Sequence, residues 1–94
     1  VKIFPLGEGA LTIDFGNEIS VALNDEVLRL EAFFNRQNFP GLIETVPAYS
    51  SLTVFYDVFT VRKNFPEFAT AFEAVKYFIK AARQSAGEFE RNEP

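Results

Sequence analysis

The order in which the hydrophobic period changes along the chain constrains the fold more than any other feature. Residues 10–15 alternate apolar and smaller or polar side chains with a period of two, which is typical of a strand with one buried face. A helical spacing follows, in which the apolar residues fall three or four positions apart: Ile19, Leu23, Val27, Leu30 and Phe34. The pattern therefore predicts a strand and then an amphipathic helix, whose apolar stripe needs a second layer to cover it.

Turn residues divide the first half of the chain into these elements. The apolar stretch that opens at Ile3 stops at Gly7-Glu8-Gly9, where two glycines around one acid suit a turn with positive φ and predict a hairpin. Ser20 and Asn24 are both candidates for the cap of the helix, and the sequence does not decide between them. Residues 38–41, Asn-Phe-Pro-Gly, are typical of a helix end.

A second hairpin is predicted in the next stretch. Residues 42–46 form a short strand limited by Pro47, and residues 51–56 form another that is rich in β-branched and aromatic side chains. The connection over 47–50 is short enough for a hairpin, and Asp57 ends the second strand. Residues 58–63 are expected to be a loop or a short extension.

The last predicted element is a helix that begins near Asn64. Asn64 and Glu67 have the spacing of a capping box, and Gly87 is a natural terminator. One face of this helix carries the apolar residues Phe68, Phe72, Val75, Ile79 and Ala82. The expected domain therefore covers residues 1–87, and residues 88–94 are a tail or the start of a linker.

The predicted order is strand-strand-helix-strand-strand-helix, which places the chain in the α+β class. Because both helices must bury an apolar stripe, we expect a two-layer sandwich: a four-stranded antiparallel sheet with both helices on one face. Phe55 points opposite to Val54 and Tyr56, and Phe4 alternates against Ile3, so the other face of the sheet also carries aromatic residues. Two interpretations stay open for that face: a docking surface for another domain or subunit, or partial burial under loops and the tail.

Composition excludes several kinds of chemistry. The 94 residues include no His and no Cys, so histidine-dependent triads, thiolate nucleophiles and disulfides are excluded. The net charge of −4 and the scattered cations argue against nucleic acid, and no stretch is apolar enough to span a membrane. The absence of Cys fits a cytoplasmic protein, though it is also compatible with secretion. Glu8, Asp14 and Asp57 stand near strand ends, but nothing in their spacing indicates a catalytic pair or a metal site, so capping and solvation are the expected roles.

Two motifs carry a resemblance to a known family. The first is IFPLGEGALTIDFG at residues 3–16, and the second is FPGLIETVPAYSSLTVFYD at residues 39–57. Together they resemble the KipI/PxpB family, which includes one subunit type of allophanate hydrolase and one of 5-oxoprolinase. The likeness covers residues 2–57. Within the proteins of that family it extends only to the N-terminal domain. This chain departs from the family pattern at Ser50, where members often carry Arg, and at Val58, where they often carry Pro.

The resemblance implies an α+β domain that a larger cyclophilin-like barrel follows in full-length members. It implies that the partner is a homologous second subunit, and that ATP is a requirement of the complex rather than a cofactor of this domain. The activity implied is the opening of 5-oxoproline or the hydrolysis of related amides and urea derivatives, with no catalytic residue expected here. The residues that we expect to matter as family-motif or partner-binding positions are Gly7, Pro47, Tyr49, Ser51, Phe55 and Asp57.

Three functions compete at this stage. The first is subunit or domain docking in an amide-hydrolysing complex, which the commoner metabolic members favour. The second is inhibition of a sporulation histidine kinase, as in the KipI branch. The third is a stand-alone domain that forms a homodimer through its open sheet face.

Overall fold

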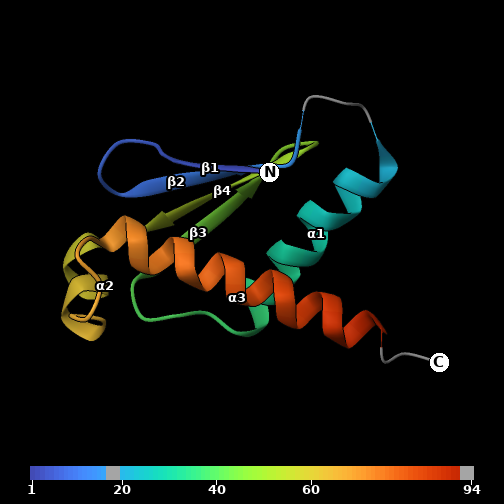
Figure 1. Cartoon of the computed structure of the whole chain (residues 1–94). Coiled ribbons are helices and arrows are strands. Elements are labelled where there is room, and N and C mark those ends of the chain that lie inside the picture. Colours follow the sequence, from blue (N-terminus) through green and yellow to red (C-terminus); the bar gives the residue numbers. More distant parts are fainter. Residues whose placement is uncertain (17–19, 92–94) are drawn as a thin grey trace.

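Two hairpins, each closed by a short turn, build the sheet of the computed structural model, which describes residues 1–16 and 20–91 (Figure 1). In the first hairpin Gly7 has a φ of +68°, and the Leu6 N–H donates to the Ala10 carbonyl over 2.8 Å. In the second, the Ala48 N–H donates to the Ser51 carbonyl over 2.8 Å. The four strands are β1 (Lys2–Pro5), β2 (Ala10–Asp14), β3 (Leu42–Pro47) and β4 (Ser51–Tyr56).

The two hairpins meet in the middle of one antiparallel sheet with the order β1-β2-β4-β3. Ile13 pairs with Leu52 and Thr12 pairs with Thr53, so alternate residues of both central strands share a face. The predicted alternation holds, with one difference: Ala10 and Thr12 on the second face are also nearly buried, at 3% and 9% exposure. Both are small side chains on β2, which has a strand on either side of it.

Helices lie on one face of this sheet, as the sequence predicted (Figure 1). The two long helices are α1 (Val21–Arg36) and α3 (Ala71–Arg91). Their buried residues pack with those of the sheet into one core that includes Leu11, Ile13, Leu52, Val54 and Tyr56 from the strands and Val27, Leu30, Phe34, Val75 and Ile79 from the helices. The two-layer α+β sandwich is thus confirmed.

Ser20 is the cap of α1. Its Oγ accepts from the Leu23 N–H over 3.5 Å, and its carbonyl accepts from the Asn24 N–H over 3.1 Å. The alternative cap, Asn24, uses its side chain elsewhere, as described below. The first residue of the expected stripe, Ile19, lies outside the described residues.

The prediction for residues 58–70 was wrong. A third helix, α2 (Val58–Asn64), stands where a loop was expected, because Asp57 caps its first turn. Asn64 is the last residue of α2, and its side-chain amide donates to the Thr60 carbonyl over 2.8 Å, so it caps no following helix. Phe65 precedes Pro66, a position that disfavours helical backbone, and its φ of −131° ends α2.

The start and the end of α3 also differ from the prediction. Thr70 caps this helix: its Oγ1 accepts from the Glu73 N–H over 3.1 Å, so Phe68 lies before the helix rather than in its stripe. The pair Thr70 and Glu73 has the Thr-x-x-Glu spacing of a capping box, a signal that the competing pair Asn64 and Glu67 obscured. The helix continues through Gly87 to Arg91, so Gly87 does not terminate it.

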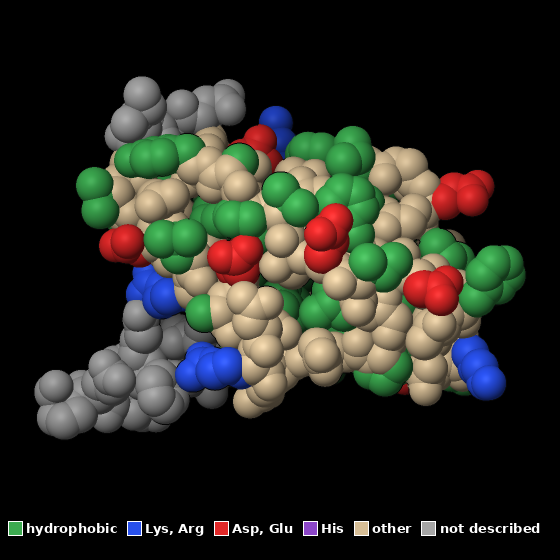
Figure 2. Space-filling view, turned by 180° about the vertical axis from the view of Figure 1, so that it is seen from behind, with side chains coloured by type: hydrophobic (Ala, Val, Ile, Leu, Met, Phe, Trp, Pro, Cys, Tyr) green, Lys and Arg blue, Asp and Glu red, His purple; other side chains and the backbone are tan. Residues whose placement is uncertain are grey.

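Seen from behind, the surface mixes hydrophobic and acidic side chains, and Lys and Arg stand at its margins (Figure 2). Within residues 1–16 and 20–91, none of the helices combines the length and the apolar character that crossing a bilayer requires.

Candidate functional site

The structure places the six expected site residues at two opposite ends of the sheet. Ala10 pairs with Phe55 at one end of β2, and Asp14 pairs with Ser51 at the other. Gly7, Phe55 and Asp57 therefore gather at the end where the first hairpin turns, and Pro47, Tyr49 and Ser51 gather at the end where the second turns. The five-residue strand between them is about 17 Å long, so the six do not form one site.

The second hairpin turn is held from two sides. The Asn24 side-chain amide donates to the Tyr49 carbonyl over 3.0 Å, and the Ser50 hydroxyl donates to the Gly16 carbonyl over 2.7 Å. The Phe15 N–H returns a bond to the Ser50 carbonyl over 2.9 Å. These bonds fix the loop, while Tyr49 stays 46% exposed at its tip.

Sequence reasoning missed the roles of Asn24 and Ser50. At this turn Ser51, an expected site residue, contributes its carbonyl to the Ala48 N–H, whereas Ser50 contributes its hydroxyl. The departure from the family pattern at position 50 thus supplies a structural bond. No periodicity or motif signals these contacts, because each joins residues at least 25 positions apart.

Asp57 joins the sheet to α2. Its carboxylate accepts from the Phe59 N–H over 3.1 Å and from the Thr60 hydroxyl over 2.8 Å, and its own N–H donates to the Gly41 carbonyl over 2.7 Å. The expectation that Asp57 binds backbone at the strand end is confirmed. Gly41 has a φ of +100°, and a Cβ there would lie 2.7 Å from a methyl group of Val61, so only glycine fits this joint.

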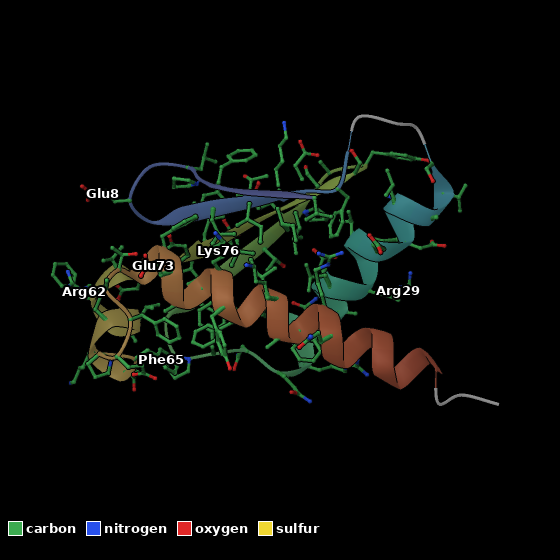
Figure 3. All side chains as sticks on the ribbon, viewed as in Figure 1. Glu8, Arg29, Arg62, Phe65, Glu73 and Lys76 are labelled. Carbon is green, nitrogen blue, oxygen red and sulfur yellow. The ribbon has the colours of Figure 1, made fainter. Side chains whose placement is uncertain are left out.

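The three candidate carboxylates stay apart and serve local backbone. Asp14 accepts from the Gly16 N–H over 2.9 Å, Asp57 caps α2, and Glu8 stands at the tip of the first turn, pointing away from the molecule (Figure 3). In the described part of the chain, no three acidic side chains come together in a way that could hold a metal ion. These three carboxylates therefore do not form an acid–base pair with one another.

The helix-free face of the sheet, which we call the open face, has a small centre between larger flanks. Phe4, Thr12, Thr53 and Val46 form one row across the four strands, and Ala10, Phe55 and Glu44 form the next. The Thr12 and Thr53 hydroxyls lie 3.0 Å apart and bond to each other. Phe4 is 41% exposed and Phe55 is half-buried, so aromatic carbon reaches solvent on this face.

Several other aromatic rings pack against α3 from the side of α1 and from the segment that follows α2. The ring centroids of Phe65 and Phe78 are 4.6 Å apart, and those of Phe39 and Phe78 are 5.0 Å apart. A shallow pocket of 190 Å³ opens beside this cluster, lined by Phe33, Phe34, Gln37, Phe39, Phe78, Ala81 and Ala82. The lining holds no titratable group, so the pocket has no chemistry of its own.

Burial raises the pKa of Tyr56 above its ordinary value of 10.0, because the folded structure removes its hydroxyl from water. Tyr56 lies at the end of β4 on the helix side, and only 2% of it is exposed. This tyrosine therefore stays neutral at physiological pH and contributes to the core rather than to acid–base chemistry.

Comparison with known proteins gives likenesses over most of the chain. A family model described as the carboxyltransferase domain, subdomain C and D, matches residues 1–92. The chain is 45% identical over 76 residues to a 5-oxoprolinase subunit of Bacillus subtilis (strain 168), which amounts to 80% of this chain and 32% of that protein. It thus spans about a third of the length of this curated relative.

Two solved structures are similar in fold and sequence. The N-terminal domain of the histidine kinase inhibitor KipI from Bacillus subtilis aligns with a TM-score of 0.78 at 39% identity, covering 98% of this chain and 93% of that domain. The protein PH0987 from Pyrococcus horikoshii aligns with a TM-score of 0.76 at 34% identity, covering 93% of this chain and 36% of that one. The likeness thus spans nearly all of the KipI domain and about a third of PH0987.

Proposed function

The chain belongs to the KipI/PxpB family of carboxyltransferase C and D subdomain proteins, and from that membership we propose that it is an N-terminal docking module of an amide-hydrolysing subunit. In this proposal the open face of the sheet binds a companion subunit or domain. The complex uses ATP to open a cyclic amide of the 5-oxoproline type or to hydrolyse a urea derivative. This domain supplies contacts, and other chains supply the catalytic groups.

The observation that carries the proposal is the aromatic carbon on the open face. Phe4 reaches solvent on the edge strand β1, and Phe55 is half-buried on β4, while the centre between the strands is small and nearly buried. The large aromatic side chains flank small ones, so the open face has a shape that a companion subunit or domain can complement. Aromatic side chains are among those that contribute most when an interface buries them.

Two substitutions test the docking surface. We expect Phe4→Ser and Phe55→Ser to reduce co-purification of the second hydrolase subunit, each about tenfold, because each removes an aromatic contact. The matched control is Phe59→Ser, since Phe59 is 86% exposed but lies on α2. Equal retention by all three variants would remove the open face from the proposal.

A second candidate function is supported by the likeness to the KipI N-terminal domain, which covers nearly all of both chains. In this case the domain binds a histidine kinase and blocks its phosphorylation without catalysing a reaction. Kinase autophosphorylation, measured with the domain at stoichiometric amounts, would fall. Unchanged autophosphorylation at an excess of the domain would reject the inhibitor function while leaving the docking function intact.

A further inference from the structure

Positive charge is concentrated on the last two helices of this acidic protein. Residues 58–84 carry five Lys or Arg and two acidic residues, whereas the rest of the chain carries four basic and eleven acidic residues. Three of the five cations lie on α3 at a spacing of four and then three positions. We call these three residues the basic stripe: Lys76, Lys80 and Arg83.

Helix geometry makes the basic stripe continuous. Positions i, i+4 and i+7 lie on one side of an α-helix, and seven residues of helix span about 10 Å. Lys80 is exposed, while Lys76 and Arg83 are half-buried. Tyr77 lies beside the stripe and is 57% exposed, so an aromatic ring borders the positive charge on its solvent side.

Two aromatic rings hold the cations at the ends of the stripe. The Lys76 ammonium lies 5.9 Å from the centroid of the Phe72 ring, and the Arg83 guanidinium lies 5.3 Å from that of Phe15. A cation over a ring keeps its full charge while its side chain loses freedom. A partner that binds the stripe therefore meets charges whose positions are already restricted, which lowers the entropic cost of binding.

The stripe lies on the flank of α3 that faces away from α1. Phe78 lines the pocket between α1 and α3, and it projects from nearly the opposite side of the helix to Lys76 and Arg83. Phe15 directly follows β2, and α3 contacts β2, whereas α1 contacts β3 and β4. The stripe therefore lies at the margin of the helical layer and not between the two long helices.

The charge of the stripe is not neutralised within the part of the chain whose side chains are described. Over residues 1–16 and 20–84, no acidic group forms an ion pair with Lys76, Lys80 or Arg83. Glu73 lies one turn before Lys76, at the end of α3 nearest to α2 (Figure 3). An acidic residue in a first turn interacts favourably with the helix dipole. The three cations are therefore open to an anionic partner.

The size of the stripe favours a short acidic segment of protein. A nucleic-acid strand or an anionic membrane extends well beyond about 10 Å, and it would approach the acidic remainder of the chain within the Debye length of about 8 Å. A protein segment can place its acidic residues on the stripe alone. Alternate residues of an extended segment lie about 6.6 Å apart, close to the rise of about 6 Å between Lys76 and Lys80.

We propose that the basic stripe binds a short acidic segment of a partner protein, whose carboxylates pair with the three cations and whose neighbouring apolar residue contacts Tyr77. This inference goes beyond the docking function assigned to Phe4 and Phe55 and does not rest on it. Those two residues lie on the open face, and α3 lies on the opposite side of the sheet.

A synthetic peptide tests the chemistry of the occupant directly. The probe alternates Glu and Ser around one central Leu, and its counterpart has Lys in place of every Glu. We expect the Glu peptide to bind, to shift the amide resonances of residues 76–83, and to bind more weakly as salt is added. Failure of the Glu peptide to bind, equal binding of the Lys peptide, or shifts centred on Phe4 and Phe55 would overturn the proposal.

Charge-matched variants separate the stripe from the other cations. We expect K80Q/R83Q to weaken binding of the Glu peptide by about fivefold, a size typical of two exposed ion pairs. The control R62Q/K63Q also removes one Lys and one Arg, from exposed positions on α2, and should leave affinity within about twofold. K80Q alone keeps Arg83 over Phe15 and should weaken binding by about twofold. Equal weakening by the two double variants would reject the stripe as the site.

An aromatic variant tests the apolar part of the site. Tyr77→Ser should weaken binding of the Glu peptide by about threefold, because it removes the ring beside the stripe. The control Phe59→Ser removes a ring that is 86% exposed on α2 and should leave the affinity unchanged. Circular dichroism should show that both variants stay folded. Equal affinity of the two variants would contradict the contact with Tyr77.

Competition experiments test the other possible occupants. Vesicles that contain phosphatidylserine and a short oligothymidine should both fail to displace the Glu peptide. Displacement by either one would overturn the assignment to a protein segment in favour of a lipid surface or a nucleic acid. Sedimentation at low salt tests a second copy of the chain: if the protein self-associates and K80Q/R83Q separates the copies, the acidic segment belongs to this chain, and the assignment to a different partner is overturned.

Discussion

At the scale of single residues, a few positions hold the two ends of the sheet in place. Ser50 and Asn24 secure the second hairpin turn, and Gly41 permits the close approach between β3, β4 and α2. Asn24 and Ser50 act through hydrogen bonds to distant backbone, and Gly41 acts by leaving space for Val61. We therefore expect substitutions at these positions to change the geometry of the candidate surfaces.

Gly41→Ala should destabilise the domain strongly. The added Cβ would lie 2.7 Å from Val61 Cγ2 and 3.2 Å from the Val61 backbone nitrogen, at a φ of +100°. We expect a loss of about 2–4 kcal/mol in the free energy of unfolding from strain and overpacking. Urea unfolding measures it.

The matched control is Gly7→Ala. Gly7 also has a positive φ, +68°, but a Cβ there would meet nothing within 4 Å. We therefore expect Gly7→Ala to lower the free energy of unfolding by only about 1 kcal/mol, which is the cost of the backbone conformation alone. If the two variants lost equal stability, contact with Val61 would not be the reason that Gly41 is required.

Tyr56 predicts a loss of stability at alkaline pH. Because burial raises the pKa of Tyr56 in the folded state, the native protein keeps the phenolic proton after the unfolded chain has begun to release it. The stability that neutral Tyr56 contributes to the folded state is fully present below the unfolded pKa of 10.0, and it is lost as the pH rises through the folded pKa. Urea unfolding between pH 8 and about 11 should therefore show stability falling above about pH 10.

Tyr56→Phe is the control for this pH dependence, because it keeps the ring and removes the titrating hydroxyl. The wild-type protein should lose more stability than the variant over the alkaline range. Parallel curves for the two proteins would show that other groups cause the loss.

At the scale of the elements, side-chain caps decide where the helices begin. Ser20 starts α1, Asp57 starts α2 and Thr70 starts α3, and each accepts from a backbone N–H in the first turn. Asp57 is also a family-motif position, so its capping bonds give a structural reason for the residue type there. The joint at Asp57 connects the end of β4 to the helical layer.

Asp57→Ala should cost about 1 kcal/mol of stability, because the Phe59 N–H and the Thr60 hydroxyl both lose their acceptor. Asp57→Asn keeps an oxygen at the same place and should cost only a few tenths of that. Hydrogen exchange at the Phe59 amide should rise in the alanine variant and stay near the wild-type rate in the asparagine variant. Equal exchange in both would mean that the cap contributes little.

At the scale of the whole molecule, one layer of helices leaves one sheet face open. The core lies between the sheet and α1 and α3, and the open face carries small residues between aromatic ones. A domain of this length buries only a little over ~60% of its unfolded surface, so its stability depends on few side chains. Phe4 and Phe55, which carry the proposed docking surface, lie on the opposite face of the sheet from this core.

Ile79→Ala should destabilise the entire domain by about 2–5 kcal/mol, because Ile79 on α3 is fully buried in the single core. Tyr77→Ala, two residues away and 57% exposed, should cost far less. Unfolding followed by tyrosine fluorescence and by circular dichroism should stay coincident for Ile79→Ala. Separate transitions by the two probes would indicate that α3 unfolds independently of the sheet.

Much of the architecture could be predicted from local pattern. The period of two at residues 10–15, the β-branched and aromatic content of residues 51–56, the glycine turn at Gly7 and the spacing of Val27, Leu30 and Phe34 are all local features of the sequence. The pattern failed at residues 58–70, where Asp57 caps an unexpected helix and two capping signals, at Asn64 and at Thr70, compete. It also failed at Gly87, since a glycine permits a helix end without requiring one.

The candidate surfaces were less predictable than the fold. The sequence by itself determined the four strands, the two long helices, the two-layer arrangement and the family, because periodicity and motifs are properties of short stretches of chain. Only the tertiary structure decided that Tyr49 and Phe55 stand at opposite ends of the sheet, that Ser50 bonds Gly16, and that α1 lies beside β3. Strand order and helix placement bring distant residues together, and that juxtaposition follows from packing of the whole chain rather than from any local spacing.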